Sequence, residues 1–141
     1  MRMSRGMLLG VLLCLFAPAV AAAQTTLAAA AERARRAWQA HHPEELVGRS
    51  PRLTLSLPAM APADALEPAQ ATALFRELFS RGTELETVIR AVRTTGAGEG
   101  YVELRRRFRL AGTQEVAQQT VLLAFRLSGE QWLLAEVRVL E

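Results

Sequence analysis

Hydrophobic positions repeat along this chain at two spacings, and the change comes near residue 82. In 26–39 and in 68–80 apolar residues return every three or four positions, which predicts two amphipathic helices. Pro68 opens the second segment and Gly82 stands just past its end, as helix boundaries favour. The apolar positions are Leu27, Ala30, Ala31, Ala34 and Trp38 in the first segment, and Ala71, Leu74, Phe75, Leu78 and Phe79 in the second.

Elsewhere the apolar residues alternate with polar ones, the period of a half-buried strand. A first strand is predicted at 53–57, after a short helical turn that starts at Pro43, and the segment 58–68 is predicted to be a loop. Four long strands follow, at 84–93, 100–111, 115–127 and 131–140, separated by turns that contain glycine. Helices first and an antiparallel meander last indicate the α+β class.

The first 23 residues have the three parts of a signal peptide. Arg2 and Arg5 precede an apolar run of about a dozen residues, and Ala21-Ala22-Ala23 has the small-residue pattern of a cleavage site. The run is shorter than the ~20 residues of a membrane-spanning helix. We therefore expect a signal peptide at 1–23, a single domain at 24–141 without a stable membrane span, and a periplasmic or secreted location.

Composition narrows the function classes. The 17 basic residues, all arginine, face 14 acidic ones, and the net charge falls from +3 to about +1 once residues 1–23 are removed. That balance does not point to nucleic acid. The one cysteine, Cys14, lies in the predicted signal peptide, so the mature chain offers no disulfide. His41 and His42 are adjacent with no evident third ligand, and neither a metal nor a cofactor is expected.

Four short patterns stand in the predicted helices and strands: Ala34-x-x-x-Trp38 before His42-Pro43, Leu74-Phe75-x-x-Leu78-Phe79, Gly100-Tyr101, and the closing Gly129-Glu130-Gln131-Trp132-x-Leu134. Together with the order of the elements, they resemble the nuclear transport factor 2-like superfamily of cystatin-like cones. The ending Leu134-Ala135-Glu136-Val137-Arg138 is similar to a small exported branch of unassigned function. The resemblance implies N-terminal helices packed on a curved antiparallel sheet. It implies little about activity, because this fold hosts isomerases, dehydratases, transport factors and scaffolds.

The turns predict which strand residues face each other. A turn at Gly112-Thr113 places Arg106 opposite Gln119, and one at Ser128-Gly129 places Gln119 opposite Arg138 and Val121 opposite Glu136. Arg106, Gln119, Glu136 and Arg138 would then converge inside an otherwise apolar face. Two interpretations stay open: the cluster binds a carboxylate or sulfate at a cavity mouth, or Glu136 only neutralises the arginines. A one-residue bulge would scatter it.

Three functions follow from these expectations. The first is an exported, non-catalytic binding or scaffold protein of the bacterial envelope, whose partner is a small anionic molecule or an envelope component. The second is an isomerase or dehydratase with Glu136 as base and Tyr101 or a histidine as acid, although neighbouring arginines would weaken that base. The third is a homodimeric structural module, marked by exposed Leu122, Val137 and Val139 on the convex face. The arginines at 105, 107 and 109 are expected to form a solvated stripe on that face.

Overall fold

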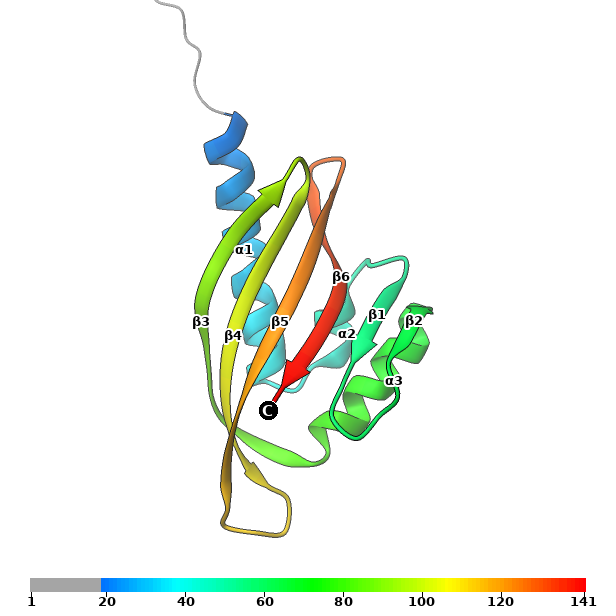
Figure 1. Cartoon of the computed structure of the whole chain (residues 1–141), viewed down its shortest axis with the longest axis vertical. Helices are drawn as coiled ribbons and strands as arrows, with labels where there is room; N and C mark the ends of the chain where they lie inside the picture. Colours follow the sequence, from blue (N-terminus) through cyan, green and yellow to red (C-terminus); the bar gives the residue numbers. More distant parts are fainter. Residues whose placement is uncertain (1–18) are drawn as a thin grey trace, which may run out of the picture.

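The computed structural model describes residues 19–141, with side chains from residue 26 onward (Figure 1). Residues 1–18, which hold most of the predicted signal peptide, lie outside the described part. The elements in chain order are α1 (Ala19–Gln39), α2 (Pro43–Val47), β1 (Leu53–Ser56), β2 (Ala63–Leu66), α3 (Pro68–Phe79), β3 (Gly82–Gly96), β4 (Glu99–Leu110), β5 (Val116–Ser128) and β6 (Gln131–Leu140). Among the described helices none is long and apolar enough to cross a membrane.

The strands form one open, mixed sheet in the order β2-β1-β6-β5-β4-β3. Neighbours are antiparallel, except that β1 runs parallel to β6. The α+β class with a four-stranded meander is confirmed. The predicted loop at 58–68 is wrong in part, because β2 lies within it. Its sequence, Ala63-Asp64-Ala65-Leu66, has little strand propensity, and it becomes a strand by pairing with the edge of β1.

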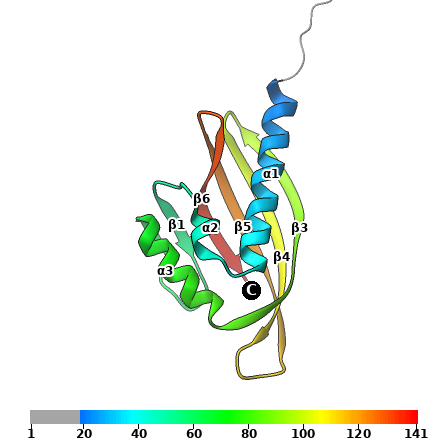
Figure 2. The ribbon, with the colours of Figure 1, turned by 180° about the vertical axis from the view of Figure 1, so that it is seen from behind.

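Helix α1 covers the inner face of the meander, as the view from behind shows (Figure 2). Its apolar stripe packs into the same core as the inward residues of β4 and β5, and this core includes the fully buried Trp38. Helix α3 lies to one side against α2 and β1, and it reaches the core through Phe75 and Phe79, whose rings meet Trp38 edge-on at 6.0 and 5.2 Å. The expected apolar face is therefore present, with α1 as its main cover.

The edge strand β3 is tied to α1 by hydrogen bonds at Thr87. Its backbone N–H donates to Gln39 Oε1 at 2.7 Å, and its carbonyl accepts from Arg35 Nη1 at 3.2 Å. Edge strands expose unpaired backbone groups that invite other chains to pair. Side chains of α1 satisfy both groups of Thr87, so the helix covers the edge as well as the face.

Strand β6 does not have the predicted register. The turn falls at Gly129-Glu130, one residue later than expected, so Phe125 pairs with Leu134 instead of Trp132. A bulge follows at Ala135, and beyond it Glu136 pairs with Ala124 and Arg138 with Leu122. The extra residue turns the end of the strand over. The expectation that Val137 and Val139 are exposed on the convex face is therefore wrong, since both are buried.

Candidate functional site

The structure brings together two of the four predicted site residues. Arg106 and Gln119 are register partners, and Arg106 Nη1 donates to Gln119 Oε1 at 3.2 Å. Glu136 and Arg138 lie on the opposite face of the sheet, with Arg138 Nε 3.8 Å from Glu136 Oε1. The expected convergence of all four is wrong, and the bulge at Ala135 is the physical reason. Anion binding by these residues stays a prediction, which now concerns two separate pairs.

The counterion of Arg106 is Glu84, on β3, and not Glu136. Both side chains are 2 % exposed, and Arg106 Nη2 donates to Glu84 Oε1. Thr87 Oγ1 donates to Glu84 Oε2 at 2.9 Å, and His41 Nε2 lies 3.1 Å from Glu84 Oε1. Burial lowers the pKa of the Arg106 guanidinium, and Glu84 offsets part of that change. An arginine still keeps its charge at any ordinary pH, so the pair is ionic.

Aromatic rings enclose the rest of this ion pair. The guanidinium carbon of Arg106 lies 3.9 Å from the Phe108 ring centre and 5.4 Å from that of Trp38. His41 stacks on Phe79 with ring centres 4.4 Å apart. None of the network's side chains lines the hollows described below. Because Arg106 and Glu84 are almost fully buried, the network is an internal link between α1, β3 and β4.

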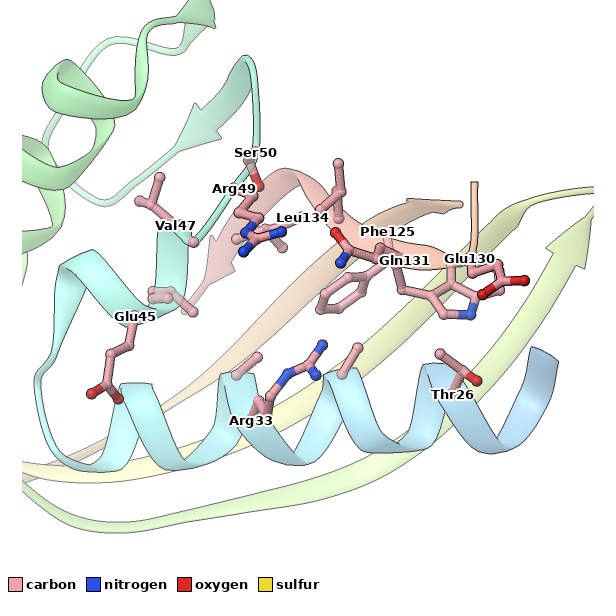
Figure 3. Close-up of a pocket in the computed structure, with 16 residues that line it drawn as sticks. Thr26, Arg33, Glu45, Val47, Arg49, Ser50, Phe125, Glu130, Gln131 and Leu134 are labelled. Carbon is pink, nitrogen blue, oxygen red and sulfur yellow. The ribbon is translucent and has the colours of Figure 1, made fainter. Parts of the chain in front are cut away.

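The largest of these hollows is a groove of about 310 Å³ between α1, the α2–β1 connection and the β5–β6 end of the sheet (Figure 3). Helix α1 contributes Ala30 and Ala34 to its wall, and the sheet contributes Phe125, Trp132 and Leu134. Cavities of this size and partly apolar character are typical small-molecule sites. The groove is therefore the best candidate for a ligand site among the described residues.

Two arginines face each other across this groove. Arg33 rises from α1, and Arg49 reaches toward it from the segment after α2 (Figure 3). Within residues 26–141, neither makes an ion pair or a side-chain hydrogen bond, whereas most other arginines of the fold are paired. Two free guanidinium groups on facing walls offer forked donors to one anion.

A buried hydroxyl lies beside Arg49. Ser50 is 2 % exposed, it lines the groove, and its Oγ has no hydrogen-bond partner within the described residues. Buried polar atoms nearly always have a partner, so an unsatisfied one at a cavity wall points to a molecule that binds there. Its position follows from Gly48, whose φ of 57° ends α2 and turns the chain.

Carboxylates lie at the two ends of the groove. Figure 3 shows Glu45 near α2 and Glu130 at the β5–β6 turn, with the arginines between them. Glu45 lies 3.5 Å from His42 Nδ1, away from the arginine pair. The centre of the groove is thus its positively charged part.

A smaller hollow of about 200 Å³ lies on the outer face of the sheet, where Tyr101, Ala124 and Glu136 form one row across the strands. It brings together the expected base, Glu136, and one of its expected acids, Tyr101. The Glu136 side chain is 37 % exposed and lies next to Arg138. This is not the apolar, enclosed setting that a carboxylate base of an isomerase needs.

The sequence interpretation did not identify Arg33, Arg49 or Ser50. For Arg33 a signal existed, because helical spacing puts it beside the buried Ala30 and Ala34 at the border of the apolar stripe. Arg49 and Ser50 follow Gly48 in a connection with no hydrophobic periodicity, so the sequence did not indicate that their side chains line the groove. Glu84 was read only as the start of a strand, and its pairing with Arg106 depends on how β3 meets β4.

Comparisons with known proteins agree on the fold. No protein-family model and no curated protein matches the sequence. A solved ketosteroid isomerase-like protein from Erwinia carotovora atroseptica is similar, with a TM-score of 0.68 and 16 % identity over 82 % of this chain and 93 % of its own. A cystatin-like domain of unknown function from Nostoc punctiforme has a TM-score of 0.65 and 14 % identity, covering 84 % and 76 %.

A third solved structure is a hypothetical protein with a ketosteroid isomerase-like fold from Catenulispora acidiphila, in complex with trimethylamine. Its TM-score is 0.61 and its identity 13 %, over 79 % of this chain and 84 % of its own. At sequence identities this low, structural similarity shows a shared fold and does not show a shared activity. The chain has the ketosteroid isomerase-like fold of the nuclear transport factor 2-like and cystatin-like proteins, as the sequence resemblance predicted.

Proposed function

We propose that this protein is a non-catalytic binding protein that holds a small anionic molecule in the groove between α1 and the β5–β6 end of the sheet. The observation that carries the proposal is the pair Arg33 and Arg49, two guanidinium groups on facing walls with no partner among the described residues. The unsatisfied hydroxyl of Ser50 supplies a third donor. Together they match the oxygens of a carboxylate or sulfate.

The carboxylates support binding without turnover. An isomerase of this kind needs a carboxylate base with a raised pKa in an apolar pocket. The buried carboxylate of Glu84 is paired with Arg106, that of Glu45 is 70 % exposed, and that of Glu136 is 37 % exposed beside Arg138. The trimethylamine complex of the Catenulispora protein adds that a relative of this fold takes up a small molecule.

We further propose that the protein is exported and cleaved near Ala23. The support is the sequence of 1–23, together with the position of Leu27, the first buried side chain described in α1. Removal of 1–23 would keep every side chain that the described part of α1 buries, from Leu27 to Trp38. Mass spectrometry of the envelope and secreted fractions should find an N-terminus near Gln24, and an intact Met1 in the cytoplasm would contradict export.

Anion binding is tested by calorimetry on the purified protein with acetate, benzoate, sulfate and phosphate. We expect at least one anion to bind, and Arg33→Gln or Arg49→Gln to weaken it by roughly 10- to 100-fold, since a charged hydrogen bond contributes ~1.5–3 kcal/mol. Arg36→Gln is the matched control, because Arg36 lies on α1 outside the groove and is 66 % exposed. The proposal fails if no anion binds, or if the control weakens binding equally.

A further inference from the structure

The groove has a charged part and an apolar part, and both bear on the nature of its ligand. Arg33 on α1 faces Arg49 and Ser50 on the opposite wall, whereas Phe125 and Leu134 form an apolar wall on the sheet side. A bare inorganic anion would use only the charged part. We infer that the ligand is an amphipathic monoanion, with a carboxylate or sulfonate head and an apolar body; the inference rests on the proposed function.

The room for an apolar body exists because two residues of α1 are small. Ala30 and Ala34 lie one turn apart on the buried stripe and line the groove on either side of Arg33. Longer side chains at these positions would fill the hollow. The short methyl groups instead leave room beside Phe125 and Leu134, where an alkyl or aryl group can bury apolar surface.

The charges favour one negative charge on the ligand. Arg33 and Arg49 carry two positive charges, and Glu45 and Glu130 place two negative charges at the ends of the groove. A doubly charged phosphate would gain from the arginines but be repelled from both ends. A single carboxylate between the two guanidinium forks leaves the ends free, and Ser50 Oγ can donate to one of its oxygens.

The test is a chain-length series measured by calorimetry on the wild-type protein: acetate, butanoate, hexanoate and octanoate, with octanesulfonate, phosphate, octanol and octylammonium beside them. Affinity should rise about three- to four-fold for each added CH₂ until the apolar part of the groove is full, because burying one CH₂ contributes ~0.8 kcal/mol. Octanesulfonate should bind with an affinity similar to that of octanoate, because both have a monoanionic head group on an alkyl chain. Octanol and octylammonium should bind at least 10-fold more weakly.

Ala34→Leu should remove the dependence of affinity on chain length, because the longer side chain occupies the apolar part of the groove. Ala29→Leu, on the exposed face of the same helix, is the matched control and should keep the wild-type dependence. If Ala34→Leu does not fold, the series on the wild-type protein still decides the inference.

The outcomes separate the two proposals. If all anions bind with equal affinity and require Arg33, the anion site stands and the amphipathic ligand is wrong. If octanol binds as well as octanoate, the groove selects apolar molecules and both proposals fail. If nothing in the series binds, both proposals fail as well.

Discussion

Glu84 and Arg106 form a salt bridge inside the protein, with both side chains 2 % exposed. It links the start of β3 to β4 near the C-terminal end of α1, where His41 and Thr87 also contact the carboxylate. Removing two charges from water is costly, so such a pair is stable only when each charge keeps its partner. The pair joins β3 to β4, and Trp38 and His41 contact it from the end of α1, so its loss should disturb all three elements.

Arg106→Met should lower the free energy of unfolding by about 3–5 kcal/mol, because it leaves the Glu84 carboxylate buried without its cation. The double variant Arg106→Met/Glu84→Gln should recover a large part of that loss. Urea denaturation measures both. Arg107→Met is the control, since its pair with Glu86 is at the surface and contributes under about 1 kcal/mol. Additive losses in the double variant would contradict the explanation.

The ion pair of Glu32 and Arg35 on α1 gives a pH prediction. The hydrogen bonds from Arg35, the closest at 2.7 Å, hold the pKa of Glu32 below its ordinary value of 4.5. A carboxyl whose pKa is lowered by folding stabilises the fold above the unfolded pKa, and that contribution disappears as the pH falls through the folded pKa. Glu32→Gln should thus destabilise the protein at pH 7 and not at pH 2.

The effect on stability should be small, at most about 0.5 kcal/mol, because Glu32 is 44 % exposed. A carbon-13 NMR titration of Glu32 is the sharper measurement and should give a pKa below 4.5 in the wild-type protein. Arg35→Gln should raise it, and Arg36→Gln should change it less, since Arg36 Nε is 3.9 Å away. An unchanged titration in Arg35→Gln would refute the assigned cause.

Gly100 and Leu27 form a tight contact between β4 and the start of the described side chains of α1. A Cβ on residue 100 would lie 2.5 Å from Leu27 Cδ2, and Leu27 is fully buried. Gly100→Ala should cost about 1–3 kcal/mol by overpacking. Leu27→Ala should cost about 2–5 kcal/mol by opening a cavity.

The double variant Gly100→Ala/Leu27→Ala should be more stable than the sum of the two losses predicts, because the new methyl enters the cavity. Thermal and urea unfolding of all four proteins give this cycle. Gly112→Ala is a control for glycine replacement without contact, since nothing lies within 4 Å of its Cβ position, although its φ of 75° adds strain of its own. Strict additivity at 100 and 27 would show that the contact is not tight.

Phe75→Ala should lower the free energy of unfolding by about 3–5 kcal/mol. Its ring is fully buried and lies 6.0 Å from Trp38 and 6.1 Å from Phe79, so its removal opens a cavity between α3 and α1. Leu74→Ala, one position earlier and only partly buried, should cost less. A loss under about 1 kcal/mol for Phe75→Ala would mean that α3 does not anchor the core.

Local patterns alone were enough to predict both long helices, the four long strands and the pairing of β4 with β5. The apolar stripe of α1 and the alternation in β4 depend only on residues close in the sequence, so both can be recognised before the fold is known. The register of Arg106 with Gln119 followed from the turn at Gly112. Its φ is 75°, a backbone conformation that glycine adopts without the steric cost of a side chain.

Tertiary structure decided the end of β6 and, with it, the predicted site. The alternation in Leu134-Ala135-Glu136-Val137-Arg138 does not say which side chains face the core. One extra residue at Ala135 moves every side chain after it to the opposite face of the sheet. The exchange buries Val137 against Leu123 and turns Glu136 and Arg138 outward. Burying two valines on the core side favours the bulge, and that gain depends on residues more than ten positions away.

The groove was likewise decided by tertiary structure. Arg33 lies on a helix, and Arg49 and Ser50 lie in a connection after Gly48, and nothing in the spacing of these residues brings them together. They line the same groove because α1 lies across the sheet and β1 pairs in parallel with β6, which carries the α2–β1 connection over that groove. Periodicity reports which face of an element is buried, whereas the meeting of side chains across elements depends on how those faces pack.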